Sequence, residues 1–151
     1  MVIELWTLLW IVADPGREPR IIADYTKTVA LDPNDAAAYT NRGNSYDDKG
    51  EYALAIADFD KAIALNPNDA NAYYNRGNAY DDKGEYDLAI ADFDKAIALN
   101  PNDAYAHNNR AVTYEKNGDK EQAIADFRKT LEIDPSHQYA KESLKRLGVT
   151  P

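Results

Sequence analysis

Cysteine is absent from this chain of 151 residues, and histidine occurs only twice, as His107 and His137. The absence of cysteine excludes disulfides, thiolate nucleophiles and cysteine-ligated metals, and it leaves the redox compartment unconstrained. Two histidines are too few for a histidine-rich metal site. We therefore expect neither a metal nor any other cofactor.

Positive charge is scarce, because 17 Lys and Arg stand against 26 Asp and Glu and leave a net charge of −9. A chain of this sign is poorly suited to phosphate groups, so we expect no nucleic acid among its partners. We expect instead a protein or peptide partner of polar or basic character.

An apolar run long enough to span a membrane is missing as well. Residues 1–13 form an apolar stretch interrupted by Glu4 and Thr7. This stretch is shorter than the roughly 20 residues that a membrane-spanning helix needs, so we expect no membrane span. A signal peptide starts with a basic region, whereas the only charge here is acidic. We therefore expect no signal peptide and a cytoplasmic location.

Catalytic signatures are also absent. The chain contains no G-x-S-x-G, H-E-x-x-H, glycine-rich phosphate loop or dinucleotide-binding fingerprint. The stretch that starts at Asp32 begins like an EF-hand loop, but Ala36 and Ala37 occupy the fifth and sixth positions, where that loop needs Asp or Asn and then Gly. With no nucleophile beside a base, we expect a protein that is not an enzyme.

What the chain does contain is an internal repeat. Residues 36–69 and 70–103 are identical at 30 of 34 positions, and residues 104–137 match the second copy at 13 positions. Before them, residues 22–35 match 56–69 at nine of 14 positions, whereas residues 2–21 hardly match. We therefore predict one domain with a degenerate leading copy over 1–35 and three regular copies.

Each copy has the apolar spacing of a helical hairpin. Ile56, Phe59 and Ile63 recur at i, i+3 and i+7, which places them on one side of a helix. In every copy an aspartate precedes the first helix, a glycine marks the bend and a proline follows the second helix. These residues are Asp35, Asp69 and Asp103; Gly50, Gly84 and Gly118; and Pro67, Pro101 and Pro135.

The repeat resembles the tetratricopeptide repeat (TPR) family through A-x-A-Y-x-N-R-G-N-x-Y-x-x-K-G-E-Y-x-x-A-I-A-D-F-x-K-A-I-A-L-N-P-N-D. The resemblance covers residues 22–137, and residues 138–148 look like the polar helix that closes such arrays. It implies an all-α fold, a right-handed superhelical solenoid of stacked antiparallel helix hairpins whose first helices line a concave groove. The expected function is a non-catalytic scaffold that binds proteins or peptides.

Several repeated residues have the character of a core. Phe59 and its equivalents are large anchors, and Gly43 and Gly77 allow helices to approach closely. An arginine and an aspartate recur in every regular copy, and we expect Arg42, Arg76 and Arg110 to pair with Asp58, Asp92 and Asp126. Leu8 replaces this arginine in the leading copy, so we expect Asp24 to depend on Arg42. His107 stands where Tyr39 and Tyr73 stand, and we expect it to be packed in the interior.

The resemblance assigns the groove to fixed positions of the repeat. Asparagines there can bind the main chain of an extended peptide or form a solvated face with local hydrogen bonds. Asp pairs lie at helix C-termini, where the helix dipole disfavours anions, and they either select Lys or Arg on a partner or serve solvation. The candidate groove residues are Asn41, Asn44, Asp47, Asp48, Asn71, Tyr74, Asn75, Asn78, Asp81, Asp82, Tyr105, Asn108 and Asn109.

Chaperone-binding members of the family hold a terminal carboxylate with a clamp of basic residues and asparagines. Asn44 and Asn75 match the asparagines of that clamp. Thr40, Tyr105 and Asn109 occupy the places of its cations. We therefore do not expect an acidic chaperone tail as the partner.

The N-terminus departs from the repeat. A terminal helix that is apolar on nearly all sides is covered by a partner or rests on something apolar. Self-association through residues 1–20, with or without exchange of the first helix, is the alternative function; an apolar ligand or an imperfectly packed end would also account for this sequence. The near-identical copies fit an engineered or recently duplicated chain. The apolar N-terminal patch comprises Ile3, Trp6, Leu9 and Trp10.

Overall fold

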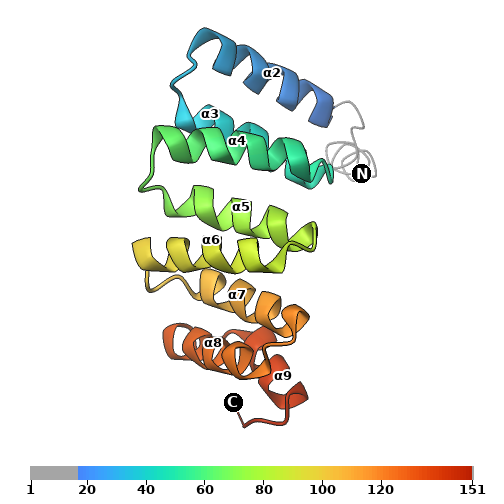
Figure 1. The fold of residues 1–151 in the computed structure, drawn as a ribbon, viewed down its shortest axis with the longest axis vertical. Coiled ribbons are helices and arrows are strands. Elements are labelled where there is room, and N and C mark those ends of the chain that lie inside the picture. The colour runs from blue at the N-terminus through green and yellow to red at the C-terminus, as the bar shows by residue number, and fades with distance from the viewer. Residues whose placement is uncertain (1–16, 151) are drawn as a thin grey trace, which may run out of the picture.

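The computed structural model describes residues 17–150, and all regular structure within that range is α-helical (Figure 1). Eight helices are stacked in antiparallel pairs from α2 at one end to α9 at the other, which confirms the predicted all-α array. They are α2 (Arg17–Leu31), α3 (Ala36–Asp48), α4 (Tyr52–Leu65), α5 (Ala70–Asp82), α6 (Tyr86–Leu99), α7 (Ala104–Asn117), α8 (Lys120–Ile133) and α9 (Gln138–Arg146).

Single residues determine where the helices begin and end. The Asp35 carboxylate accepts a hydrogen bond from the backbone N–H of Ala38 at 3.0 Å and so caps α3. Asp69 and Asp103 cap α5 and α7 in the same way. Gly118 ends α7 with a φ of 93°, a left-handed conformation that glycine adopts without steric cost. The predicted caps and bend are confirmed.

The hairpins pack through a close contact between a phenylalanine and a glycine. Phe59 on α4 is fully buried, and a Cβ atom placed on Gly43 of α3 would lie only 2.7 Å from its Cε1 atom. Phe93 and Gly77 repeat the contact between α6 and α5. The second helix of each hairpin also packs on the first helix of the next hairpin. A side chain at either glycine would therefore push two helices apart.

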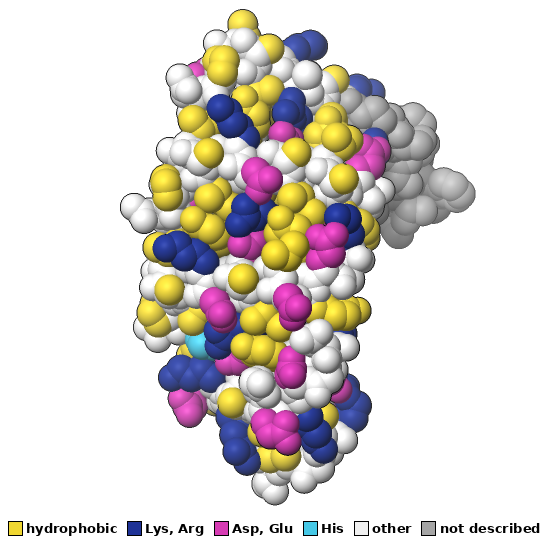
Figure 2. Space-filling model, in the orientation of Figure 1, with side chains coloured by type: hydrophobic (Ala, Val, Ile, Leu, Met, Phe, Trp, Pro, Cys, Tyr) yellow, Lys and Arg dark blue, Asp and Glu magenta, His cyan; other side chains and the backbone are white. Residues whose placement is uncertain are grey.

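Arginine links the helices through ion pairs. Arg42 donates from Nε and Nη2 to the two carboxylate oxygens of Asp58, each at 2.7 Å. Arg76 binds Asp92 in the same way, and its Nη1 also donates to Asp60 of the preceding copy at 2.5 Å. These pairs confirm the predicted partners of the repeated arginines. Figure 2 shows basic and acidic side chains lying next to one another along the array, with hydrophobic side chains between them.

The prediction that Asp24 depends on Arg42 is wrong. Arg42 contributes its Nη1 to the hydroxyl of Thr26 at 3.4 Å. The reason is register, because Thr26 lies one full repeat before Asp60, the position that receives the arginine of the following copy. Asp24 instead lies 3.7 Å from the ammonium group of Lys27 in an exposed pair.

Helix α9 ends the array with one buried face and one polar face. Ala140, Ser143 and Leu144 are fully buried against the last hairpin, whereas Lys145 is exposed. Leu144 lies one full repeat after Arg110, so a leucine replaces the repeated arginine at the end of the stack. The change allows α9 to close the core without an unpaired charge.

At the other end, α2 begins at Arg17 and includes Pro19 in its first turn, where a proline is tolerated. Among the helices from α2 to α9, none is long and apolar enough to cross a membrane. The predicted apolar N-terminal patch lies outside the described residues: Ile3, Trp6, Leu9 and Trp10.

Candidate functional site: a polar wall on the first helices

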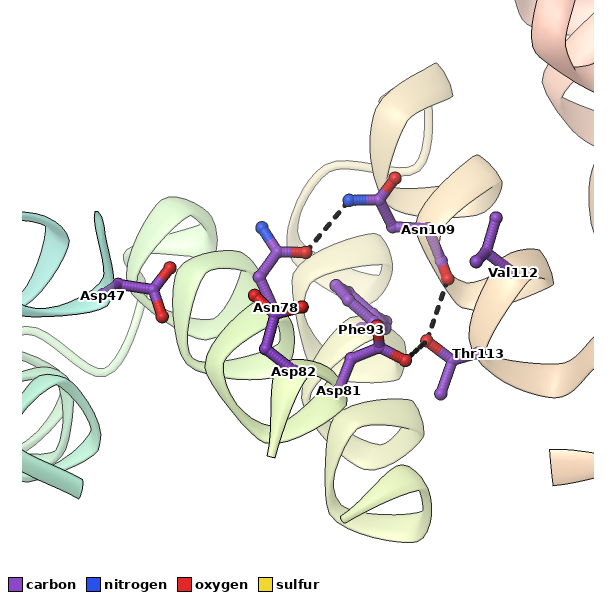
Figure 3. Close-up of a pocket in the computed structure, with 8 residues that line it drawn as sticks. All are labelled: Asp47, Asn78, Asp81, Asp82, Phe93, Asn109, Val112 and Thr113. Atoms are coloured by element: carbon purple, nitrogen blue, oxygen red, sulfur yellow. Dashed lines mark hydrogen bonds between the residues drawn. The ribbon is translucent and has the colours of Figure 1, made fainter. Parts of the chain in front are cut away.

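The candidate groove residues lie on α3, α5 and α7, the first helices of the three hairpins. These helices also contact one another directly, α3 with α5 and α5 with α7, so they form a continuous surface that we call the first-helix wall. A cavity of about 300 Å³ opens in this wall (Figure 3), and we call it the acidic pocket. It is lined by Asp47, Asn78, Asp81, Asp82, Phe93, Asn109, Val112 and Thr113.

The asparagines of the wall bind one another across copies. Asn75 donates from Nδ2 to Oδ1 of Asn44 at 2.9 Å. One copy further, Asn109 donates from Nδ2 to Oδ1 of Asn78 and to the hydroxyl of Tyr74, both at 2.9 Å. Both N–H groups of Asn109 are therefore engaged within the protein. We call these cross-copy bonds the amide ladder, and they join neighbouring hairpins. The sequence had suggested instead that the asparagines bind a peptide main chain or form a solvated face with local hydrogen bonds.

The Asp pairs of the wall differ in their surroundings. The Asp81 carboxylate accepts a hydrogen bond from the hydroxyl of Thr113 at 2.9 Å and pairs with the ammonium group of Lys116. Both partners come from the following copy, on α7. Asp81 is therefore satisfied across the contact between α5 and α7, and its negative charge is balanced.

Asp47 occupies the same register position one copy earlier, but its surroundings lack these partners. The residues that correspond to Thr113 and Lys116 are Ala79, which has no hydroxyl group, and Asp82, which has the wrong charge. Figure 3 shows the Asp47 carboxylate directed from α3 towards Asn78 and Asp82 on α5. Its Oδ1 atom is buried and has no hydrogen-bond partner among residues 17–150.

This environment changes the acidity of Asp47. Burial raises the pKa of its carboxyl group to about 6, and the nearby charges of Asp82 and Asp48 act in the same direction. An acid with this pKa loses its charge in mildly acidic solution, in contrast to an ordinary aspartate. The chemistry of the pocket therefore depends on pH near neutrality.

The remaining candidates are spread along the wall. Asn41, Asp48 and Asn71 are exposed, and Tyr105 is 66% exposed with its ring 6.0 Å from that of His137. These side chains are accessible but lie outside the acidic pocket.

Asn108 differs from these candidates because it is buried, with only 8% of its surface exposed. Its Nδ2 donates to Oδ1 of Asn109 at 3.3 Å. It therefore supports the amide ladder from inside.

Sequence reasoning missed the role of the third copy in the pocket. Lys116 neutralises Asp81, Thr113 donates a hydrogen bond to it, and Val112 adds apolar surface to the pocket. The signal was present, because Lys116 stands where the second copy has Asp82. Alignment of the third copy with the second is enough to reveal this change of charge.

His107 belongs to the interior, as predicted, and is 5% exposed. Its Nε2 lies 3.1 Å from the carbonyl oxygen of Pro101, and its Nδ1 lies 3.5 Å from Oδ1 of Asp126. Over residues 17–150, no group of three or more His, Asp or Glu side chains is arranged to hold a metal ion.

Models of tetratricopeptide repeats match most of the chain. One described as "Tetratricopeptide repeat" matches residues 70–103 and 104–137, and one described as "TPR repeat" matches residues 43–84. A further "Tetratricopeptide repeat" model matches residues 24–57. The comparison with curated proteins found no match.

Solved structures share the architecture. The crystal structure of MamA aligns with a TM-score of 0.81 and 30% identity, over 89% of this chain and 83% of that one. The first TPR of Spaghetti (RPAP3), bound to the HSP90 peptide SRMEEVD, aligns at 0.73 and 26% identity, over 75% and 90%. The TPR domain of Arabidopsis OM64 aligns at 0.73 and 27% identity, over 75% and 93%.

Proposed function

Because the chain belongs to the tetratricopeptide repeat family of non-catalytic interaction scaffolds, we propose that its first-helix wall binds an extended basic segment of a partner protein. The observation that carries the proposal is the acidic pocket, which residues from three consecutive copies build on this wall. Exposed amides elsewhere on the first-helix wall, on Asn41 and Asn71, offer donors and acceptors to the main chain of a peptide.

The likeness to a peptide-bound domain supports peptide binding but not the same peptide. The Spaghetti domain is bound to SRMEEVD, which ends in acidic residues. In this chain, Thr40, Tyr105 and Asn109 stand where clamp cations would be needed. Asn109 is also engaged with Asn78 and Tyr74. The first-helix wall therefore favours a positively charged partner.

Fluorescence anisotropy with labelled extended peptides tests this function. We expect basic peptides to bind, with an affinity that falls as salt screens the attraction, and acidic peptides not to bind. Asn41→Arg with Asn71→Arg adds two positive charges to the wall and should abolish binding. The control variant, Ala57→Arg with Ala91→Arg, adds the same charge at exposed positions of the second helices and should keep most of the peptide binding. Equal binding of acidic and basic peptides would refute the proposal.

Self-association through residues 1–20 remains the second candidate, and the apolar sequence of residues 1–13 favours it. Light scattering on the full chain and on a Trp6→Glu, Trp10→Glu variant separates the two functions. An oligomer that becomes a monomer in the variant supports self-association. A monomer in both cases eliminates it.

A further inference from the structure

We propose that the acidic pocket receives one lysine or arginine side chain of the bound peptide and holds its cation between Asp47 and Asp82. The inference rests on the proposed function of the first-helix wall and names what the partner must contribute. It also assigns the neighbouring Asp81 no part in binding, because the protein already neutralises that residue.

The third copy shows how a cation sits on this position of the repeat. The ammonium group of Lys116 binds Asp81, and the side chain reaches it across the contact between α7 and α5. Asp47 and Asp81 are separated by one repeat and occupy the same place on their helices. An ammonium or guanidinium group can therefore reach Asp47 in the same manner, but it has to come from another molecule because Asp82 replaces the lysine.

The described basic side chains near this part of the pocket are already engaged. Lys116 is bound to Asp81, and its charge also acts on Asp82. The lysines nearest in sequence are engaged elsewhere, Lys49 with Glu51 at 2.7 Å and Lys83 with Glu85 at 2.5 Å. Within residues 17–150 neither Asp47 nor Asp82 forms an ion pair. A carboxylate with one buried oxygen that is unpaired among the described residues is costly, so the structure gains from an external cation beside the Asp47 carboxylate, which lines the cavity.

The other walls of the pocket suit a long basic side chain. Val112 provides apolar surface against which the methylene groups of lysine or arginine can pack, and the fully buried Phe93 lies beneath it. Asn78 lies beside Asp82 on α5, with its amide oxygen bound to Asn109 (Figure 3), and adds a polar group to the wall of the pocket. The cavity of about 300 Å³ leaves room for one such side chain. The pocket is therefore suited to bind a single basic side chain, in contrast to a broad acidic surface.

The test compares two labelled peptides of alanine and serine, one with a single central lysine and one with norleucine in its place. Norleucine keeps the apolar chain and removes the charge. We expect the lysine peptide to bind about tenfold more tightly. Asp47→Asn should remove this preference, whereas Asp48→Asn should keep most of it, because Asp48 is exposed and does not line the pocket.

A gain-of-function variant provides the complementary test. Lys116→Asp frees Asp81 and recreates in the third copy the charges found around Asp47. We expect a second site, detected as tighter binding of peptides with two lysines than of peptides with one. Circular dichroism of each variant establishes that it is folded before binding is measured.

The outcomes separate this inference from the proposed function. Equal binding of the lysine and norleucine peptides, or an unchanged preference in Asp47→Asn, would overturn the inference that the acidic pocket binds one lysine or arginine side chain. Peptide binding by the first-helix wall would remain intact. No binding of any basic peptide would overturn both.

Discussion

The ammonium group of Lys116 binds the carboxylate of Asp81 across the junction of two hairpins, whereas the equivalent Asp47 faces Asp82. Two junctions between equivalent helices of the repeat therefore differ in their electrostatics, one joining opposite charges and the other like charges. In a solenoid, where each repeat touches only its neighbours, such a difference acts locally on one junction. The second junction joins opposite charges, whereas the first brings two carboxylates close together.

Lys116→Ala should lower the free energy of unfolding by about 1 kcal/mol, because Asp81 keeps only Thr113 as a partner. The side chain of Asp81 is 13% exposed, so solvent compensates the loss only in part. Urea unfolding monitored by circular dichroism measures the change. Lys120→Ala, on an exposed residue of α8, is the control and should change stability by less than about 0.5 kcal/mol. Equal effects of the two variants would contradict the prediction.

Asp47→Asn should stabilise the fold at pH 7. The pKa of Asp47 in the folded chain is about 6, above its ordinary value of 3.8. Folding therefore favours the protonated form, and the contribution of this group to stability falls as the pH rises from about 4 to about 6. Because the carboxylate is partly solvated, we expect a gain of about 1 kcal/mol above pH 6.

The gain from Asp47→Asn should disappear below pH 4, where Asp47 is protonated in both the folded and the unfolded chain. Urea unfolding at several pH values measures it, with Glu121→Gln as a control that removes one exposed charge elsewhere. A gain that is independent of pH would exclude an electrostatic origin. The same substitution should weaken binding of the lysine peptide, so stability and binding should change in opposite directions.

Asn109→Ala should cost about 2 kcal/mol, because it removes two hydrogen bonds between α7 and α5 and leaves polar atoms of Asn78 and Tyr74 without their donor. Asn41→Ala is the matched control at the same position of the first regular copy. Asn41 is exposed, so its loss should cost less than about 0.5 kcal/mol. Comparable losses in both variants would show that the amide ladder contributes little to stability.

The period of the repeat was sufficient to predict most of the fold. Caps such as Asp35 and pairs such as Arg42 with Asp58 lie within one hairpin or at its ends, so one copy of the sequence contains both partners. Contacts between copies were harder to predict. The amide bond from Asn75 to Asn44 depends on side-chain orientations across a junction, which helical spacing does not specify.

The acidic pocket was predictable only in part, for a related reason. Its carboxylates and amides were identified because they occupy positions that face the groove in the family. The charge balance depends instead on how copies differ, as in the exchange of Asp82 for Lys116. Averaging the copies into one pattern removes this information. The partner of Asp24 was misassigned for a different reason, because the arginine of each regular copy reaches back to the register position of Thr26, Asp60 and Asp94 and not to that of Asp24.

Thr26→Asp should stabilise the chain by about 0.5 kcal/mol, because it completes the arginine links of the array. Arg76 pairs with Asp60 of the preceding copy, and Arg110 pairs with Asp94. At the equivalent position Arg42 contacts the hydroxyl of Thr26, at 3.4 Å, in addition to its pair with Asp58. An aspartate at position 26 gives Arg42 a second carboxylate. The gain is modest because this pair would be exposed, as the side chain of Asp60 is at 54%.

Thr28→Asp is the matched control for that experiment. Thr26 and Thr28 each donate their hydroxyl to the backbone carbonyl four residues earlier, so both substitutions lose the same kind of hydrogen bond. Both also add one negative charge to an exposed position of α2. Only Thr26 contacts Arg42, so only Thr26→Asp should stabilise. A double-mutant cycle with Arg42→Met measures the coupling, and a coupling of zero would show that the first junction does not use the arginine link.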